Sequence, residues 1–179
     1  MKSALLVIDV QRILTEGRDA AYAVEGVIAR INALARKART AAAPVIFVQH
    51  ETKGDEMRHG TPSWQLSPAL EVQPGDHHVR KTATDSFHRT TLQALLDHLG
   101  VTRLVICGLQ SDFCVDTTTR RALALGYPVT LVADAHSTVD NGILSAQQII
   151  AHHGRTLSNI DSFDVQAVLQ PAADVRFAA

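Results

Sequence analysis

The sequence has few residues of the kinds that cross-link a fold. Only two cysteines, Cys107 and Cys114, occur among its 179 residues, so a disulfide framework is excluded and a reducing, cytoplasmic location is expected. The net charge is −1 and the basic residues are scattered, which argues against nucleic acid and membrane surfaces as partners. No apolar run is long enough to span a membrane, and the first one is broken at Asp9, too early for a signal peptide.

Glycine-rich phosphate loops are also missing. No G-x-G-x-x-G follows the first apolar run and no Walker loop occurs, so NAD, FAD and ATP are not expected as cofactors. The chain does have an ordinary hydrophobic content of 46%. A chain of this length buries enough surface to fold without a metal or a disulfide. We therefore expect one globular domain, residues 1–179.

Short apolar runs alternate with helical patterns along the chain. The runs are too short for helices and are bounded by polar residues, which favours buried strands. Between them, apolar residues recur at i, i+3, i+4 and i+7, as an amphipathic helix requires. This alternation predicts an α/β fold with a parallel sheet covered by helices on both faces. The expected strands are 4–9, 44–50, 78–82, 103–108, 128–134 and one within 156–169, and the expected helices are 22–42, 90–100, 114–126 and 141–154.

Residues 51–78 are polar and contain glycine, proline and charges, so they are expected to form a long surface loop. In parallel sheets, ligands bind beyond the carboxyl ends of the strands, which all lie at one edge. The residues that end the strands are therefore the first candidates for a functional site.

Three chemically complementary residues fall at this edge. Asp9 ends the first expected strand, Lys81 lies near the end of the third, and Cys114 follows the fourth at the start of a helix. An ammonium and a helix N-terminus would stabilise a thiolate, and a carboxylate would carry its proton to a leaving group. Each residue also has a structural interpretation: Asp9 as a turn cap, Lys81 as a surface residue, and Cys114, like Cys107, as a small buried hydrophobe.

Four segments of the sequence, in the same order, resemble the isochorismatase-like cysteine hydrolase superfamily. They are "ALLVIDVQ", the lysine before "TDSFHRTTLQALLDHLG", "LVICGLQSDFCVDTTT" and "ADAHST", and the resemblance runs from residue 4 to about 155. It implies a three-layer α/β/α, Rossmann-like fold with a six-stranded parallel sheet. It also implies a homo-oligomer, a dimer or a tetramer. "QSDFCVDTT" and "ADAHST" are similar to the streptothricin-hydrolase-like group of small-molecule amide hydrolases.

The resemblance further implies the roles of individual residues. Asp9, Lys81 and Cys114 correspond to a catalytic triad in which the cysteine attacks a carbonyl carbon, ammonia or an amine leaves, and water cleaves the thioester. The aspartate accepts and returns the proton, and the lysine stabilises charge. A cis peptide is expected between Leu109 and Gln110, with the backbone amides of Gln110 and Cys114 forming the oxyanion hole.

Two departures from related enzymes narrow the expected reaction. Isochorismatases proper, which cleave a vinyl ether, lack the nucleophilic cysteine, so Cys114 disfavours that reaction. Nicotinamidases carry an Asp-x-His pair and a further histidine for a metal, whereas "VQHETKGDEMRHG" offers His50, Asp55 and His59 without that spacing. We therefore expect no metal, no cofactor, and hydrolysis of an amide, lactam or carbamoyl bond in a small molecule. Vinyl-ether hydrolysis and a non-catalytic binding role are the alternatives.

Four further residues are candidates for substrate binding. Trp64, the only tryptophan, lies in the expected loop, where it either stacks on a flat substrate or anchors the loop. Gln11 follows Asp9 by two positions, and Phe113 precedes the nucleophile. His136 follows the fifth expected strand at the same sheet edge, where it either contacts substrate or caps the next turn.

Overall fold

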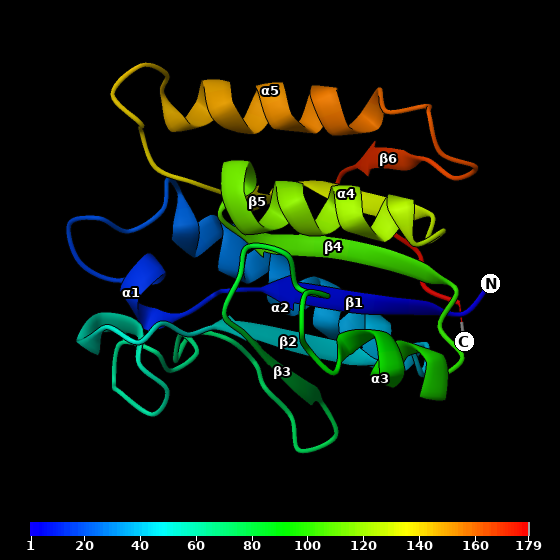
Figure 1. Cartoon of the computed structure of the whole chain (residues 1–179), viewed down its shortest axis with the longest axis horizontal. Helices are drawn as coiled ribbons and strands as arrows, with labels where there is room; N and C mark the ends of the chain where they lie inside the picture. The colour runs from blue at the N-terminus through cyan, green and yellow to red at the C-terminus, as the bar shows by residue number, and fades with distance from the viewer. Residues whose placement is uncertain (179) are drawn as a thin grey trace.

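A computed structural model, which describes residues 1–178, contains a six-stranded parallel sheet (Figure 1). The strand order is β3-β2-β1-β4-β5-β6, so the chain starts in the middle of the sheet, fills one side and then crosses to the other. This is the sheet predicted from the sequence. The strands are β1 (Ser3–Ile8), β2 (Val45–His50), β3 (His77–Lys81), β4 (Arg103–Leu109), β5 (Val129–Ser137) and β6 (Ala167–Gln170).

Helices cover both faces of the sheet and complete the predicted three layers. The helix α2 packs on one face, whereas α3, α4 and α5 pack on the other (Figure 1). The helices are α1 (Arg12–Thr15), α2 (Val24–Thr40), α3 (Leu92–His98), α4 (Asp116–Ala124) and α5 (Ala146–Ser158), with a 3₁₀ turn η1 (Asp55–Met57) and a π-helical turn η2 (Ser111–Val115).

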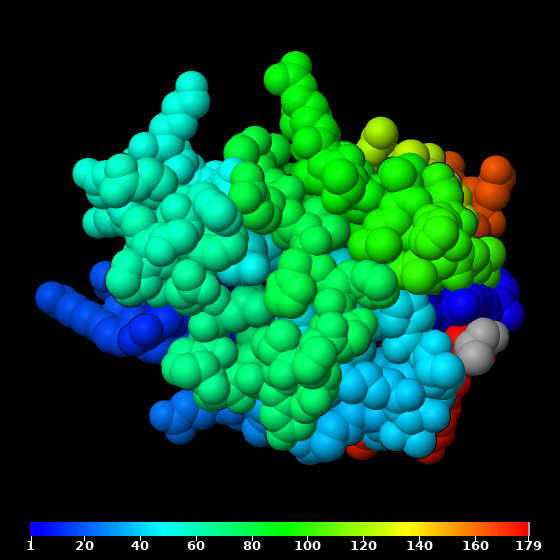
Figure 2. Space-filling view, turned by 90° about the horizontal axis from the view of Figure 1, so that it is seen from below, coloured from blue at the N-terminus to red at the C-terminus, as the bar shows by residue number. Residues whose placement is uncertain are grey.

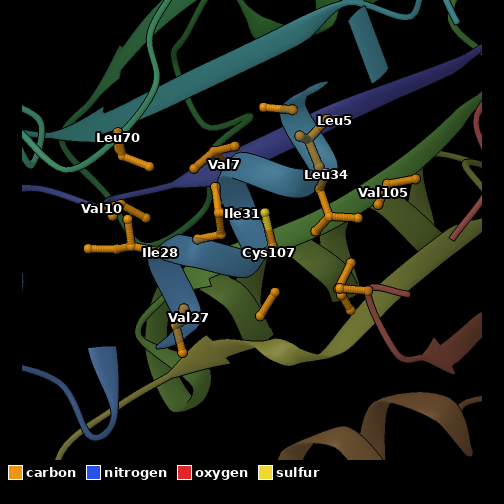
Figure 3. Close-up of a cluster of buried hydrophobic side chains, with 14 of the residues drawn as sticks. Leu5, Val7, Val10, Val27, Ile28, Ile31, Leu34, Leu70, Val105 and Cys107 are labelled. Carbon is orange, nitrogen blue, oxygen red and sulfur yellow. The ribbon is translucent and has the colours of Figure 1, made fainter. Parts of the chain in front are cut away.

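The hydrophobic core divides at the sheet, because successive side chains of a strand point to opposite faces. In β1, Leu5 and Val7 belong to the cluster under α2, whereas Leu6 and Ile8 belong to the cluster under α3 and α4. All six residues of β1 are buried, which explains why the strand reads as one continuous apolar run. The helix α2 meets the sheet with an apolar stripe at helical spacing, shown in Figure 3: Val27, Ile28, Ile31 and Leu34.

The expected elements differ from the structure mainly at their ends. The sixth strand is Ala167–Gln170, and residues 156–158 of the range expected to contain it belong to α5. The helix α5 begins at Ala146, because Ser145 and Gln148 form a capping box there. The sequence pattern indicated neither α1 nor η2, which takes the place of the first turn of the helix expected from residue 114.

The connection between β2 and β3 is packed onto the body of the molecule. Trp64, Ser67 and Leu70 are buried, and Leu66 forms an isolated bridge with Gln11, just after β1. Figure 2 shows this segment spread over the face that is seen from below, beside α3. The expected surface loop is therefore a fixed wall near the carboxyl end of β1.

The helices within residues 1–178 are too short or too polar to cross a membrane. Crossing its hydrocarbon core takes about 20 predominantly apolar residues in one helix. None of the helices within residues 1–178 combines sufficient length with sufficient apolar character.

Candidate active site

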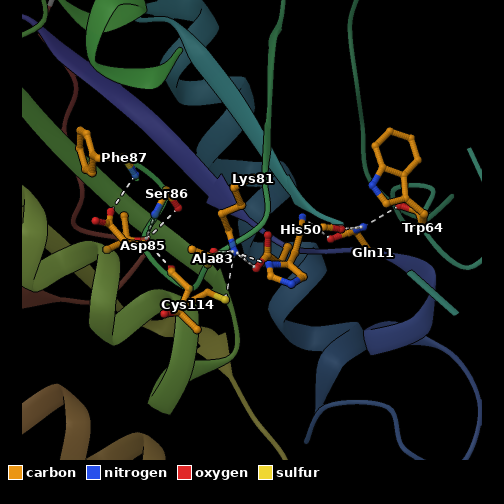
Figure 4. A network of polar contacts seen from close by, with 12 residues as sticks. Gln11, His50, Trp64, Lys81, Ala83, Asp85, Ser86, Phe87 and Cys114 are labelled. Carbon is orange, nitrogen blue, oxygen red and sulfur yellow. Dashed lines mark hydrogen bonds and ion pairs between the residues drawn. The ribbon is translucent and has the colours of Figure 1, made fainter. Parts of the chain in front are cut away.

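Asp9, Lys81 and Cys114 meet at the carboxyl edge of the sheet. Figure 4 shows Lys81 and Cys114 side by side there. The Nζ atom of Lys81 lies 2.7 Å from Asp9 Oδ2 and 3.1 Å from Cys114 Sγ. The lysine side chain has no exposed surface, and Cys114 is 8% exposed. The structure thus brings together the three residues that the sequence predicts as a catalytic triad, with the ammonium between the carboxylate and the sulfur.

The ends of three elements position these side chains. Asp9 follows β1 with a φ of +50°, in the left-handed region that costs a non-glycine residue about 1–2 kcal/mol. Lys81 is the last residue of β3 and pairs in register with His50, the last residue of β2. Cys114 lies in η2, directly after β4. Because β1, β2, β3 and β4 are parallel and adjacent, their ends bring all three groups to one point.

The thiol of Cys114 is protonated in the resting site. Burial and, after it, the charge of Asp9 raise its pKa to about 12, against the lowering effect of Lys81. Burial thus outweighs the neighbouring ammonium, which acts in the predicted direction and favours the thiolate. A reaction that uses this sulfur as a nucleophile needs a base that removes its proton.

The carboxylate of Asp9 is placed to accept that proton. Its Oδ2 atom is paired with Lys81, whereas Oδ1 is buried and has no hydrogen-bond partner among residues 1–178. A ligand atom of the carboxylate and the sulfur of Cys114 lie within 4.8 Å of each other. Leaving a buried carboxylate oxygen unpaired is costly, and such an atom is a ready acceptor.

Three side chains could in principle hold a cation here: Asp9, His50 and Cys114. One ligand atom of each lies within 4.8 Å of the others. The Nζ atom of Lys81, however, lies 2.7 Å from the carboxylate, 3.2 Å from the His50 Nδ1 atom and 3.1 Å from the sulfur. A metal ion here would have to displace the ammonium from these three groups and leave a buried charge without its carboxylate. The lysine therefore serves these groups as their cation, and they do not fit a resident metal.

Comparison with known proteins connects this geometry to a family. A model of the Isochorismatase domain matches residues 3–151, most of the chain. The chain belongs to the isochorismatase family. The resemblance noted in the sequence is thereby confirmed.

Relatives of this isochorismatase-family chain include enzymes of known name. It is 44% identical over 138 residues to a streptothricin hydrolase of Streptomyces noursei, covering 76% of the chain and 50% of that protein. The chain thus spans about half the length of this curated relative. It is 28% identical over 203 residues to the ureidoacrylate amidohydrolase RutB of Variovorax paradoxus (strain S110), covering 90% and 79%. The hydrolase class predicted from the sequence is the class of these relatives.

Solved structures of the isochorismatase family agree with the fold. The crystal structure of an isochorismatase family protein matches with a TM-score of 0.86 and 39% identity, covering 93% of this chain and 96% of the other. An isochorismatase from Pseudomonas putida KT2440 matches with a TM-score of 0.87 and 31% identity, covering 97% and 89%. The α/β architecture is thus shared over nearly the whole chain.

The turn that carries Cys114 in this isochorismatase-family member contains both predicted oxyanion donors. The peptide bond between Leu109 and Gln110 is cis, and η2 follows it directly. The backbone carbonyl of Gln110 accepts hydrogen bonds of 3.1 Å from the amides of Phe113 and Val115. These bonds fix the turn from inside. The assignment of the Gln110 and Cys114 amides to an oxyanion hole stays a prediction.

Phe113 and Trp64, two of the candidate substrate-binding residues, are in very different environments. Phe113 is 53% exposed beside the nucleophile, so its ring is available to a ligand. Trp64 is 8% exposed and packs edge-on against His59, with ring centroids 4.6 Å apart. Its Nε1 atom is buried and finds no partner within residues 1–178. The structure thus supports the anchoring interpretation of Trp64, and stacking on a substrate stays a prediction.

Gln11 is fully buried, and its amide is used by the backbone. Its Nε2 atom donates to the carbonyl oxygens of His50, at 3.0 Å, and Trp64, at 2.7 Å. Its Oε1 atom accepts from the backbone amide of His50 at 2.8 Å. The side chain therefore ties the end of β2 to the loop wall, whereas the sequence suggested a contact with substrate.

His136 lies behind the nucleophile turn and is 2% exposed. Its Nδ1 atom is 2.8 Å from the hydroxyl of Ser111, the first residue of η2, and its Nε2 atom is buried without a partner among residues 1–178. Burial and, after it, the charge of His153 lower the pKa of His136 to about 4, against an opposing effect of Asp134. In this structure the residue supports the turn, and its predicted contact with substrate is not seen.

The neutral, buried His136 predicts a loss of stability in acid. An unfolded histidine takes up a proton below about pH 6.5, whereas the folded His136 does so only near pH 4. The contribution of the neutral ring to the free energy of unfolding is therefore fully present above pH 6.5. It is lost as the pH falls to 4, by up to about 3 kcal/mol. Urea unfolding at pH 7 and pH 4.5 measures this loss. We expect a smaller loss in His136→Asn, which keeps a polar group near Ser111, than in the wild type. His88→Asn, at an exposed position, is the control, and equal losses in all three proteins would contradict the assignment.

Proposed function

We propose that this chain is a cysteine hydrolase that cleaves a C–N bond of a small amide, lactam or carbamoyl compound through a thioester on Cys114. The observation that carries the proposal is the position of the Lys81 ammonium, 2.7 Å from the carboxylate of Asp9 and 3.1 Å from the sulfur of Cys114. The names of the relatives, a streptothricin hydrolase and an amidohydrolase, support the same reaction class. Vinyl-ether hydrolysis would leave the thiol without a role.

The first half of the proposed reaction forms the thioester. The proton of Cys114 moves to Asp9 Oδ1, and the sulfur electron pair forms a bond to the carbonyl carbon. The carbonyl electron pair moves to oxygen, where the amides of Gln110 and Cys114 are the proposed donors. When this intermediate collapses, the C–N bond breaks and the carboxyl group returns its proton to the leaving nitrogen. The Lys81 ammonium stays charged and offsets the negative charge as it passes from carboxylate to sulfur.

The second half restores the enzyme. Asp9 takes a proton from a water molecule, whose oxygen attacks the thioester carbon. The C–S bond breaks, and the proton held by the carboxyl group returns to the sulfur of Cys114. The products are an acid and the free thiol, so the cycle needs only water besides the substrate. Both halves use one base and one cation, which matches the carboxylate of Asp9 and the ammonium of Lys81 beside the thiol.

The test is a panel of primary amides, lactams and ureido compounds, assayed by the release of ammonia or amine and, for the lactams, by mass spectrometry of the ring-opened amino acid. We expect turnover of at least one compound by the wild type and by Cys107→Ala, whose fully buried cysteine lies in β4 away from Lys81. Cys114→Ala should show none, and rapid quenching should leave an acyl group on Cys114 that mass spectrometry detects. Turnover that survives in Cys114→Ala would rule out the covalent route. Activity on vinyl ethers alone would favour the alternative reaction.

A further inference from the structure

The ammonium of Lys81 has more partners than it has protons. It contacts Asp9 Oδ2 at 2.7 Å, the carbonyl oxygen of Ala83 at 3.0 Å, Cys114 Sγ at 3.1 Å and His50 Nδ1 at 3.2 Å. A lysine ammonium has three N–H bonds and no acceptor, so it shares these bonds among the four atoms, whose positions together set its place in the site. His50 Nδ1 can take part only through its lone pair, which requires the neutral ring with its proton on Nε2.

His50 is held firmly in this position. It ends β2 and pairs in register with Lys81 at the end of β3. Its backbone amide donates to Gln11 Oε1 at 2.8 Å, and its carbonyl accepts from Gln11 Nε2 at 3.0 Å. The glutamine that makes both bonds is completely buried, whereas the imidazole itself is half-buried at the edge of the site (Figure 4). Ring and ammonium are therefore fixed relative to each other by adjacent strands and by one side chain.

We propose that His50 is a positioning residue for Lys81, whose neutral imidazole accepts one N–H of the ammonium and so holds it between the carboxylate and the sulfur of the proposed hydrolase. The use of this role in catalysis rests on the proposed function, whereas the positioning itself rests on the contacts described above. Protonation of His50 would remove the acceptor and place a second cation 3.2 Å from the ammonium. The site would then lose the alignment of its only buried cation within residues 1–178.

The charges around the ring favour its neutral form. Burial lowers the pKa of His50, and Lys81 lowers it further, whereas Asp9, the backbone of Ala83 and Glu51 raise it, so that the net shift is downward. The thiol of Cys114, which completes the surroundings of the ring, is uncharged at rest because its pKa is raised to about 12. At neutral pH the imidazole is therefore the acceptor that the geometry requires.

Two substitutions separate positioning from packing. His50→Asn keeps an acceptor oxygen near the place of Nδ1 but does not titrate, whereas His50→Leu keeps the bulk and removes the acceptor. His59→Asn is the matched control, because His59 lies in the same connection and packs on Trp64. The readout is the rate of Cys114 alkylation by iodoacetamide at pH 8.5, followed by mass spectrometry of the labelled peptide. This measurement needs no substrate, so it is independent of the amide panel.

We expect His50→Leu to react about tenfold more slowly, as for the loss of one charge-assisted hydrogen bond, and His50→Asn and His59→Asn to stay near the wild-type rate. In ¹⁵N-labelled wild-type protein, the His50 ring should show an unprotonated Nδ1 at pH 7. Its titration should move to higher pH in Lys81→Met. A proton on Nδ1, or a wild-type rate in His50→Leu, would overturn the proposal even if the amide panel succeeds. A panel without turnover would remove the hydrolase function and leave these two results standing.

Discussion

Asp9→Asn is expected to abolish hydrolysis while it makes Cys114 more reactive toward an alkylating agent. The substitution removes the proposed base, which should lower turnover by about 10²–10⁴-fold. It also removes the charge that, after burial, contributes most to raising the pKa of the thiol. Because the Lys81 ammonium stays 3.1 Å from the sulfur in the native geometry, we expect about ten times more thiolate at pH 8.5. Turnover and the iodoacetamide rate should thus move in opposite directions.

The control for this experiment is Asp112→Asn. Asp112 lies two residues before Cys114 and accepts a hydrogen bond of 2.6 Å from the hydroxyl of Thr138, away from the thiol. We expect neither rate to change more than about twofold, since an exposed or half-exposed charge is screened by solvent. Circular dichroism and thermal unfolding show that each variant is folded before rates are compared. If Asp9→Asn slowed both reactions alike, the aspartate would be a structural partner of Lys81 and not the base.

Gly108→Ala is expected to prevent folding. Gly108 has a φ of +117°, and a Cβ atom built on it would lie 2.1 Å from the carbonyl oxygen and 2.6 Å from the nitrogen of Ile8. These are backbone atoms of the paired strand β1, so neither can move without breaking the ladder between β1 and β4. The expected loss of unfolding free energy exceeds about 4 kcal/mol, a large fraction of the stability of a domain. The soluble yield and the urea midpoint of the purified protein measure it.

Gly126→Ala is the control that separates the effect of a steric clash on stability from the effect of the left-handed backbone conformation. Gly126 also has a positive φ, +86°, but no atom lies within 4 Å of a Cβ built there. Its substitution should cost only the left-handed conformation, about 1–2 kcal/mol. A Gly108→Ala protein that unfolds at the same urea concentration as Gly126→Ala would show that β1 yields to the extra atom. The close packing at Gly108 would then not be needed to set the turn that follows β4.

The sheet and the triad could be predicted because both depend on patterns along the chain. Buried parallel strands read as continuous apolar runs, and their carboxyl ends share one edge, which brings Asp9, Lys81 and Cys114 together. The sixth strand was hard to place because β6 is a short edge strand with only Ala167 buried. The same reasoning about strand ends could have found the contact between His50 and Lys81, since both end neighbouring strands.

The state of the groups in the site could not be predicted in the same way. The raised pKa of Cys114 and the lowered pKa of His136 come mainly from burial, which depends on what several distant segments place around a side chain. His136 illustrates the difference, because its place at the sheet edge was correct while its partner, Ser111, belongs to a π-helical turn that no sequence pattern indicated. The position of a residue along a strand therefore determines which side chains it meets, whereas its burial determines the direction in which its pKa shifts.

The hydrogen bonds of Gln11 act on the backbone of the loop wall and not on its side chains. The glutamine holds the main-chain carbonyl of Trp64 and makes no hydrogen bond to the indole, and a second buried glutamine, Gln49, donates to the same oxygen at 3.2 Å. The path of the loop at residue 64 is therefore held by its backbone as well as by the packing of the buried indole. Substitutions at exposed positions of this wall can leave the spacing of Asp9, Lys81 and Cys114 unchanged, so the ligand preference of such a scaffold can diverge by single substitutions.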